Sequence, residues 1–366
     1  MTRYTHAMPY RPTHHKGRGA LSNPASRFAT RHGEDFDDGW DTIEQDAEAP
    51  ATSLHVDPAR TIISHNQSPD LGFSASINPY KGCSHGCIYC YARPSHEYLD
   101  LSAGLDFETR IFHKPDAASR FAEELRAPGY QCTAIMLGAN TDPYQPDEKQ
   151  LRITRSLLQV ANTYNQPLSL ITKGSLICRD LDLLTAMAER NLVAVTISVT
   201  SLSNAIKRTL EPRTAAPATR LKTIARLAQA GIPVGVMVAP VIPALTDCEM
   251  EAILERAASA GAQRAEYIVL RLPHGVKSLF RDWLTTHYPD RAAHVMARVR
   301  DLHGGRDYNP EWGKRLSGSG VFAQLLARRF AIACRRHGLQ QQRWPVLDTT
   351  QFKPPLRRGD QIELDL

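Results

Sequence analysis

Short apolar segments recur between residues 73 and 270, and polar or amphipathic stretches separate them. Most are rich in Val, Ile, Leu or Ala, as expected of strands that are covered on both faces of a sheet. The six segments are Phe73–Tyr80, Thr133–Ala139, Leu168–Thr172, Val193–Val199, Val234–Ala239 and Glu266–Leu270. This pattern predicts six strands, each bounded by polar residues, glycine or proline.

Amphipathic segments, with apolar residues three and four positions apart, lie between these strands. They cover residues 151–164, 181–188, 221–228 and 250–257. Gly231 and Gly261 follow the last two, at positions where helices commonly end. Because strands and helices alternate, we expect an α/β fold with a parallel sheet. Mainly helical patterns follow the sixth strand, at about 275–287, 290–302 and 318–337.

The two flanks of this alternating region differ from it in composition. Residues 1–60 hold few apolar runs, so we expect a segment that is flexible or lies across the core, with Phe28 and Trp40 as candidate anchors. The proline-containing tail, 343–366, is expected to be irregular. The sequence thus predicts three parts: a flexible N-terminal segment (1–60), an α/β domain (61–275) and a helical, basic C-terminal extension (276–366).

The positive charge of the chain is concentrated near its C-terminus. The net charge is +6, and residues 291–366 hold 14 Lys and Arg against 7 Asp and Glu. Such a balance can attract nucleic acid, although a solvated helical surface explains it equally well. No segment approaches the run of about 18 apolar residues that a membrane span needs. The polar N-terminal residues lack the apolar region of a secretory signal, so we expect a cytoplasmic protein.

Three of the seven cysteines, Cys83, Cys87 and Cys90, follow the first predicted strand at the spacing C-x3-C-x2-C. Thiolate ligands favour zinc or an iron–sulfur cluster. The next cysteine is Cys132, so a [4Fe–4S] cluster bound here would keep one iron open. Gly82 and Gly86 can adopt positive φ and let the loop turn tightly. A zinc site completed by His85 or His96 is the alternative.

This spacing, with Tyr89 just before the last cysteine, resembles the signature of the radical S-adenosylmethionine (SAM) superfamily. The resemblance implies a partial (β/α)6 TIM-type barrel, which agrees with the six predicted strands. It also implies that the three cysteines bind a [4Fe–4S] cluster whose open iron chelates SAM. Electron transfer then cleaves SAM to a 5′-deoxyadenosyl radical that abstracts a hydrogen atom. A flavodoxin- or ferredoxin-type protein would supply the electron; the oligomeric state is left open.

The ends of the next predicted strands make a narrower resemblance. The motifs NTDPYQP (140–146), TKG (172–174) and SVTS (198–201) are similar to those of the spore photoproduct lyase-like branch, over about residues 73–275. That resemblance implies that Lys173 and Ser198 hold the SAM carboxylate. It places three further residues near the amino acid or ribose of SAM, and an aromatic residue near its adenine. These are Asn140, Thr141 and Asp142, and Tyr89.

One departure from that branch concerns the substrate. In spore photoproduct lyases a cysteine at the end of the second strand donates a hydrogen atom, and Ala139 occupies that place here. The resemblance therefore does not extend to repair of thymine dimers. Cys178 and Cys248 lie beyond the third and fifth strands and are weaker candidates for the same task. Three functions remain: a radical SAM enzyme that acts on nucleic acid, a peptide or a metabolite; a nucleic-acid-binding module with a structural zinc or iron–sulfur site; and a basic scaffold whose cluster only relays electrons.

Overall fold

The structure is a computed structural model that describes residues 15–28, 50–340 and 346–355. Within these residues, seven strands form a central sheet in the order β10-β9-β8-β7-β6-β3-β2. Six of them are parallel, and β2 pairs antiparallel with β3 at the edge. The strands are β2 (Ile63–His65), β3 (Ala75–Ile77), β6 (Ile135–Leu137), β7 (Leu168–Thr172), β8 (Val193–Ser198), β9 (Val234–Val241) and β10 (Arg264–Val269).

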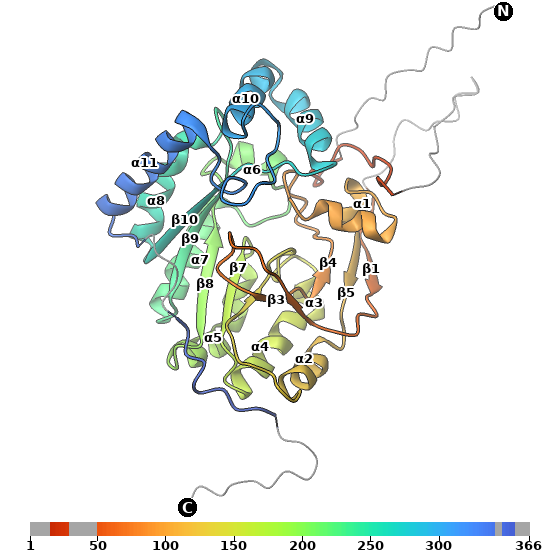
Figure 1. Cartoon of the computed structure of the whole chain (residues 1–366), viewed down its shortest axis with the longest axis vertical. Helices are drawn as coiled ribbons and strands as arrows, with labels where there is room; N and C mark the ends of the chain where they lie inside the picture. Colours follow the sequence, from red (N-terminus) through yellow and green to blue (C-terminus); the bar gives the residue numbers. More distant parts are fainter. Residues whose placement is uncertain (1–14, 29–49, 341–345, 356–366) are drawn as a thin grey trace, which may run out of the picture.

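The six parallel strands stand side by side in chain order, so each crossover moves to the next position along the sheet. Crossovers between parallel strands are right-handed, and repeated steps of this kind curl a twisted sheet into an arc of a barrel. Helices α4, α5, α7 and α8 follow one another on the outer side of this arc (Figure 1). The predicted partial barrel is confirmed.

The predicted helices correspond to α4, α5 and α7 to α11, which begin and end close to the predicted positions, whereas the other helices were not predicted. In chain order they are η1 (Arg93–Leu99), α1 (Leu105–Thr109), α2 (Ala117–Leu125), α3 (Glu148–Leu151), α4 (Ile153–Thr163), η2 (Ser175–Asp180), α5 (Leu181–Ala188), α6 (Asn204–Leu210), α7 (Pro217–Gln229), η3 (Asp247–Glu249), α8 (Met250–Ser259), α9 (Val276–His287), α10 (Pro289–Leu302) and α11 (Gly320–Arg336). Here η denotes a 3₁₀ helix.

A second, small sheet was not predicted. It consists of β1 (Ser53–Val56), β5 (Arg110–His113) and β4 (Tyr80–Lys81), with β1 parallel and β4 antiparallel to β5. Together with α1 it lies beside the barrel, on the right in Figure 1. Because β4 leads directly into the cysteine loop, this sheet supports the loop from the N-terminal side.

The C-terminal helices share a core with the barrel and are not a separate body. An apolar cluster joins Cys87, Ile88 and Tyr89 to side chains of α9 and α10, among them Trp283 and Val295. The indole Nε1 of Trp283 also donates a hydrogen bond to the carbonyl of Thr209, at 3.0 Å. The boundary at residue 275 therefore separates two patterns in the sequence, but it does not separate two cores.

The description of residues 1–60 as flexible is wrong for the part that the structure describes. Residues 18–22 are buried, and β1 belongs to a sheet. Arg18 donates hydrogen bonds to the carbonyls of Glu108 and Pro50, at 3.1 and 2.6 Å. The alternative, a segment that lies across the core, fits residues 15–28. Phe28 packs its half-exposed ring against Tyr98, while Trp40 lies outside the described residues.

No helix in the described part of the chain is long and apolar enough to cross a membrane.

Candidate active site

The cysteine loop, residues 83–90, follows β4 and turns back toward the ends of the barrel strands. Gly82 and Gly86 have φ of +80° and +69°, as the sequence predicted. Two backbone hydrogen bonds fold the loop, from Gly86 N–H to the Cys83 carbonyl and from Cys90 N–H to the Cys87 carbonyl, both at 3.2 Å. All three cysteines are free thiols that line one cavity.

The thiols lie in an environment that disfavours their charged form. Burial raises the pKa of Cys83 and Cys90, and it raises that of Cys87 to about 12. A thiolate is the form that binds metal, so a cationic centre has to compensate for this burial. Three soft donors on one wall of a cavity fit an iron–sulfur cluster, in which each cysteine binds a different iron.

The histidines that could complete a zinc site are engaged elsewhere. His85 is buried and its Nδ1 lies 3.3 Å from Oδ2 of Asp142. His96 lies away from the cavity, with its Nε2 bonded to the carbonyl of Arg110 at 2.9 Å. Within the described ranges, no three His, Cys, Asp or Glu side chains group closely enough to hold a single metal ion. A [4Fe–4S] cluster does not require such a group, because its irons are spread over a cubane.

Asp142 connects the ends of β6 and β7. Its Oδ1 accepts hydrogen bonds from Tyr144 N–H at 2.9 Å and from the Thr172 hydroxyl at 2.6 Å, and its Oδ2 accepts one from Lys173 N–H at 2.7 Å. Burial opposes the ionisation of this carboxyl, but His85 and these donors keep its pKa below the usual range. Asp142 therefore fixes the position of Lys173.

Asn140 and Thr141 also lie on the cavity wall, immediately before Asp142. The Asn140 N–H donates to Oδ1 of Asn78 at 2.8 Å, and the Thr141 hydroxyl donates to the carbonyl of Tyr80 at 2.9 Å. These contacts hold the loop after β6 against the segment that leads into the cysteine loop. The amide side chain of Asn140 is exposed toward the cavity mouth.

Lys173 and Ser198 follow β7 and end β8, so both stand at the carboxyl edge of the sheet. The Lys173 ammonium lies 5.9 Å from the centre of the Tyr89 ring. No carboxylate among the described residues lies within ion-pair distance of it. Ser198 is buried and lines the cavity, and its carbonyl accepts a hydrogen bond from Arg220 at 3.1 Å.

A buried network beneath Tyr89 was not predicted. The Tyr89 hydroxyl donates to Oε1 of Glu211, which also accepts from Thr200 at 2.7 Å, while Arg220 pairs with Oε2. Burial opposes the ionisation of Glu211, but Arg220, Lys173 and Tyr89 lower its pKa to about 2. The network gives the Tyr89 ring a fixed orientation on the floor of the cavity.

The cavity itself encloses about 950 Å³ of space, including the part that is open to solvent. It brings together all nine predicted site residues, from the cysteine loop and the ends of β6, β7 and β8. Beyond these nine residues, the lining comprises His85, Tyr91, Ile171, Met237, Pro240, Ile268, Val269 and Arg271, with a few neighbours. Arg271, two residues beyond β10, is detectable in the sequence as the charged residue after an apolar run.

The remaining cysteines do not reach the cavity. Cys132 lies before β6, Cys178 in η2 and Cys248 in η3, and none of the three is among the lining residues. Ala139 does line it, at the place where the resemblance puts a cysteine. The proposal that Cys178 or Cys248 acts as a hydrogen-atom donor is therefore wrong for this arrangement.

Comparison with known proteins identifies the family. A family model described as the radical SAM superfamily matches residues 77–257, a range that holds the whole predicted site. The chain belongs to the radical SAM superfamily. It is 36% identical to an uncharacterized protein of Mycobacterium tuberculosis over 242 residues, 66% of this chain and 70% of that protein. An uncharacterized protein of Methanocaldococcus jannaschii is 26% identical over 173 residues, 47% of this chain and 62% of that one.

Solved structures of spore photoproduct lyase have the same fold as this radical SAM protein. The complex of that enzyme with a dinucleoside spore photoproduct aligns with a TM-score of 0.56 and 18% identity, over 78% of this chain and 80% of the other. A mutant with bound SAM and the dinucleoside aligns over the same shares, with a TM-score of 0.55 and 18% identity. This likeness extends to the partial barrel and does not define a substrate. The radical SAM protein is an enzyme, and the cofactors of its superfamily are a [4Fe–4S] cluster and SAM.

Proposed function

We propose that Cys83, Cys87 and Cys90 bind the [4Fe–4S] cluster of this radical SAM enzyme and leave its fourth iron free for SAM. The observation that carries the proposal is that the three thiols face one cavity together with the polar ends of three parallel strands. No other cysteine in the described ranges lines that cavity. An open coordination position is what distinguishes a catalytic metal centre from a structural one.

SAM then occupies the cavity between the cysteine loop and the strand ends. Lys173 offers an ammonium and Ser198 a hydroxyl to its carboxylate, and both lie at the edge where β7 and β8 end. Charge-assisted hydrogen bonds of this kind suit a carboxylate in a partly dry site. Asn140 and Thr141 face the amino acid or ribose, and Tyr89 forms the wall nearest the adenine.

A reduced cluster held by Cys83, Cys87 and Cys90 would supply the electron for reductive cleavage of SAM. The residues of this chain position SAM and keep water from it. Ile171, Met237 and Val269 form apolar walls beside the polar strand ends. Asp142 holds the backbone of Lys173, and the bond from Tyr89 to Glu211 fixes the aromatic wall. Because these side chains are already held in place before SAM binds, little conformational entropy is lost when SAM binds.

Nucleic acid is the substrate class that the charge of residues 291–366 favours. Part of this charge is already compensated, since Arg329 pairs with Glu251 at 2.7 Å and Arg300 with Asp307 at 3.1 Å. If the remaining cations contact a polyanion, affinity for a single-stranded oligonucleotide falls steeply as salt rises, through release of counterions. Oligonucleotide binding that does not depend on salt, or no oligonucleotide binding at low salt, favours a peptide or a small molecule as the substrate.

The electron donor is a flavodoxin- or ferredoxin-type protein.

Reductive cleavage of SAM tests the proposed function. The protein is reconstituted anaerobically with iron and sulfide, mixed with SAM and dithionite, and sampled for 5′-deoxyadenosine by mass spectrometry. We expect 5′-deoxyadenosine from the wild type and none from the Cys87→Ala variant. The matched control is Cys334→Ala, which removes a buried thiol of α11 far from the cavity and should retain the product. A wild type that binds only zinc and forms no product would favour the nucleic-acid-binding module.

A further inference from the structure

A guanidinium group stands at the edge of the cavity without a carboxylate partner among the described residues. Arg271 lines the cavity beside Tyr91 and Ala139. Its guanidinium carbon lies 4.9 Å from the centre of the Tyr91 ring and 6.0 Å from that of Tyr308. Its Nε is buried and makes no hydrogen bond within the part of the chain that the structure describes. Aromatic rings therefore hold Arg271 in place, and its donors other than the Nη2 group that contacts the Tyr308 hydroxyl stay available.

Two carboxylates near Arg271, those of Asp70 and Asp307, form ion pairs with other arginines. Asp70 accepts from Nε of Arg315 at 2.6 Å and from the Gly313 N–H at 2.7 Å. Asp307 pairs with Arg281 at 2.6 Å and with Arg300 at 3.1 Å. Neither carboxylate forms an ion pair with Arg271, so Arg271 makes the cavity edge positive.

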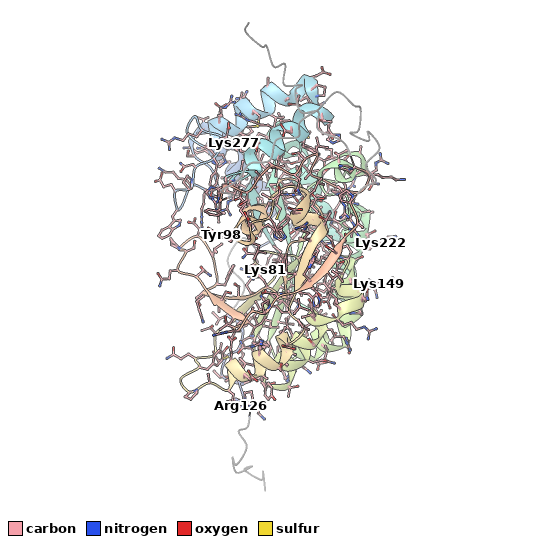
Figure 2. The ribbon with its side chains drawn as sticks, turned by 90° about the vertical axis from the view of Figure 1, so that its right-hand side faces the viewer. Lys81, Tyr98, Arg126, Lys149, Lys222 and Lys277 are labelled. Atoms are coloured by element: carbon pink, nitrogen blue, oxygen red, sulfur yellow. The ribbon has the colours of Figure 1, made fainter. Side chains whose placement is uncertain are left out.

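A second hollow lies close to Arg271. Leu272, His274, Lys277, Arg306, Asp307 and Tyr308 line it. Arg271 contacts this lining, because its Nη2 donates to the Tyr308 hydroxyl at 3.4 Å. Lys277 and Arg306 are exposed, and Figure 2 shows Lys277 at the surface of the helical part. The second hollow therefore adds two exposed cations near Arg271.

We propose that Arg271 is the centre of a subsite that binds a phosphate group of the substrate. A guanidinium offers two parallel N–H donors to a phosphate, and the cations of the second hollow suit a group that carries more than one charge or is joined to further phosphates. The substrate part that reacts then lies in the main cavity beside Ala139. This inference rests on the proposed function, because it places the substrate next to the bound SAM.

Equilibrium binding of three phosphate probes tests this subsite. Inorganic phosphate, uridine 5′-monophosphate and tetrathymidylate are each titrated by calorimetry into the reconstituted, SAM-bound enzyme, with uridine as the probe that lacks phosphate. We expect at least one phosphate probe to bind the wild type and to lose about tenfold or more in affinity in Arg271→Gln. Preference for the monophosphate indicates a terminal phosphate, and preference for tetrathymidylate an internal one.

The controls separate this proposal from the proposed function. Arg328→Gln removes an exposed arginine of α11 outside both hollows and should leave probe affinity unchanged. SAM affinity and iron content of Arg271→Gln should equal those of the wild type. Equal probe affinities in wild type and Arg271→Gln would overturn the subsite. So would a loss of SAM affinity, because it would assign Arg271 to the cofactor. Failure to form 5′-deoxyadenosine in the wild type concerns only the proposed function.

Discussion

The surroundings of Lys173 favour the binding of a carboxylate. Its backbone is held by Asp142, its ammonium lies over Tyr89, and no described carboxylate pairs with it. A charge-assisted hydrogen bond to the SAM carboxylate contributes about 1.5–3 kcal/mol. Lys173→Ala should therefore weaken SAM binding roughly 10- to 150-fold, since each 1.4 kcal/mol is a factor of ten. The measurement is a SAM titration followed by the EPR spectrum of the reduced cluster.

The same experiment needs an intact cluster in the variant, because Lys173 is not a proposed ligand. Lys149→Ala, an exposed lysine of α3, is the matched control. Equal SAM affinities in the Lys173 variant and the wild type would show that Lys173 does not bind the SAM carboxylate.

Glu211 links the site to the acid stability of the protein. Burial raises its pKa, but Arg220, Lys173 and Tyr89 outweigh burial and lower the pKa to about 2, from 4.5 in an unfolded chain. A carboxyl with a depressed pKa stabilises the fold above pH 4.5, and this contribution disappears as the pH falls toward 2. The difference in unfolding free energy between wild type and Glu211→Gln should thus be constant above about pH 5 and shrink below it. A difference that does not depend on pH contradicts this reading.

The residues of the site were predictable to different degrees. The cysteines, Lys173 and Ser198 lie directly after apolar strands, so their position along the sequence gives their position in space. Glu211 and Arg220 come from a loop and a helix after β8, where nothing local distinguishes them from surface charges. Their role depends on a tertiary contact with Tyr89, and the sequence pattern does not reveal this contact.

At the scale of elements, the presence of an apolar or amphipathic pattern decided what could be predicted. β7 and α5 have the predicted limits because each coincides with an uninterrupted apolar or amphipathic pattern. β1, β4 and β5 have two to four residues, and all four residues of β1 are exposed. Such strands are stabilised by pairing with each other, so the sequence contains no alternation or apolar run that indicates them.

The segment 15–28 packs against the cysteine loop. Oε1 and Oε2 of the buried Glu108 accept the N–H groups of Ala20 and Gly19, at 2.8 and 2.9 Å, and Glu108 also pairs with Arg93. The Nε of Arg93 donates to the Cys87 carbonyl at 2.9 Å. The segment thus covers the outer side of the cysteine loop and is fixed to it through one carboxylate.

Gly19→Ala tests whether this cover matters for the cluster. A Cβ at Gly19 would lie 1.9 Å from the carbonyl oxygen of Gly86, so the segment or the cysteine loop has to move. We expect the reconstituted variant to lose its iron–sulfur absorption in air several times faster than the wild type. In the control, Gly275→Ala, the new Cβ lies at an ordinary 3.7 Å from Glu97. Equal rates of loss in the Gly19 variant and the wild type would mean that the segment only packs on the surface.

For the whole molecule, the alternation of strands and helices predicted the parallel sheet, and the resemblance to the radical SAM superfamily predicted the barrel, but neither predicted the core that the C-terminal helices share with it. α9 and α10 pack on Cys87, Ile88 and Tyr89, and His303 at the end of α10 bonds to the carbonyl of Leu270 at 2.9 Å. The C-terminal helices therefore close one side of the site and carry Tyr308 and Arg306 to its edge. Composition distinguished this region from the barrel, whereas a shared core can be recognised only in three dimensions.

The function proposed for this protein requires that the cysteine loop holds a cluster with an open iron. Iron and sulfide analysis of the anaerobically reconstituted protein, together with Mössbauer spectra with and without SAM, tests it directly. We predict about four irons and four sulfides per chain, one iron whose spectrum changes when SAM is added, and loss of the cluster in Cys83→Ala, Cys87→Ala and Cys90→Ala. One equivalent of zinc with no charge-transfer absorption, or a cluster that survives these substitutions, would contradict the claim.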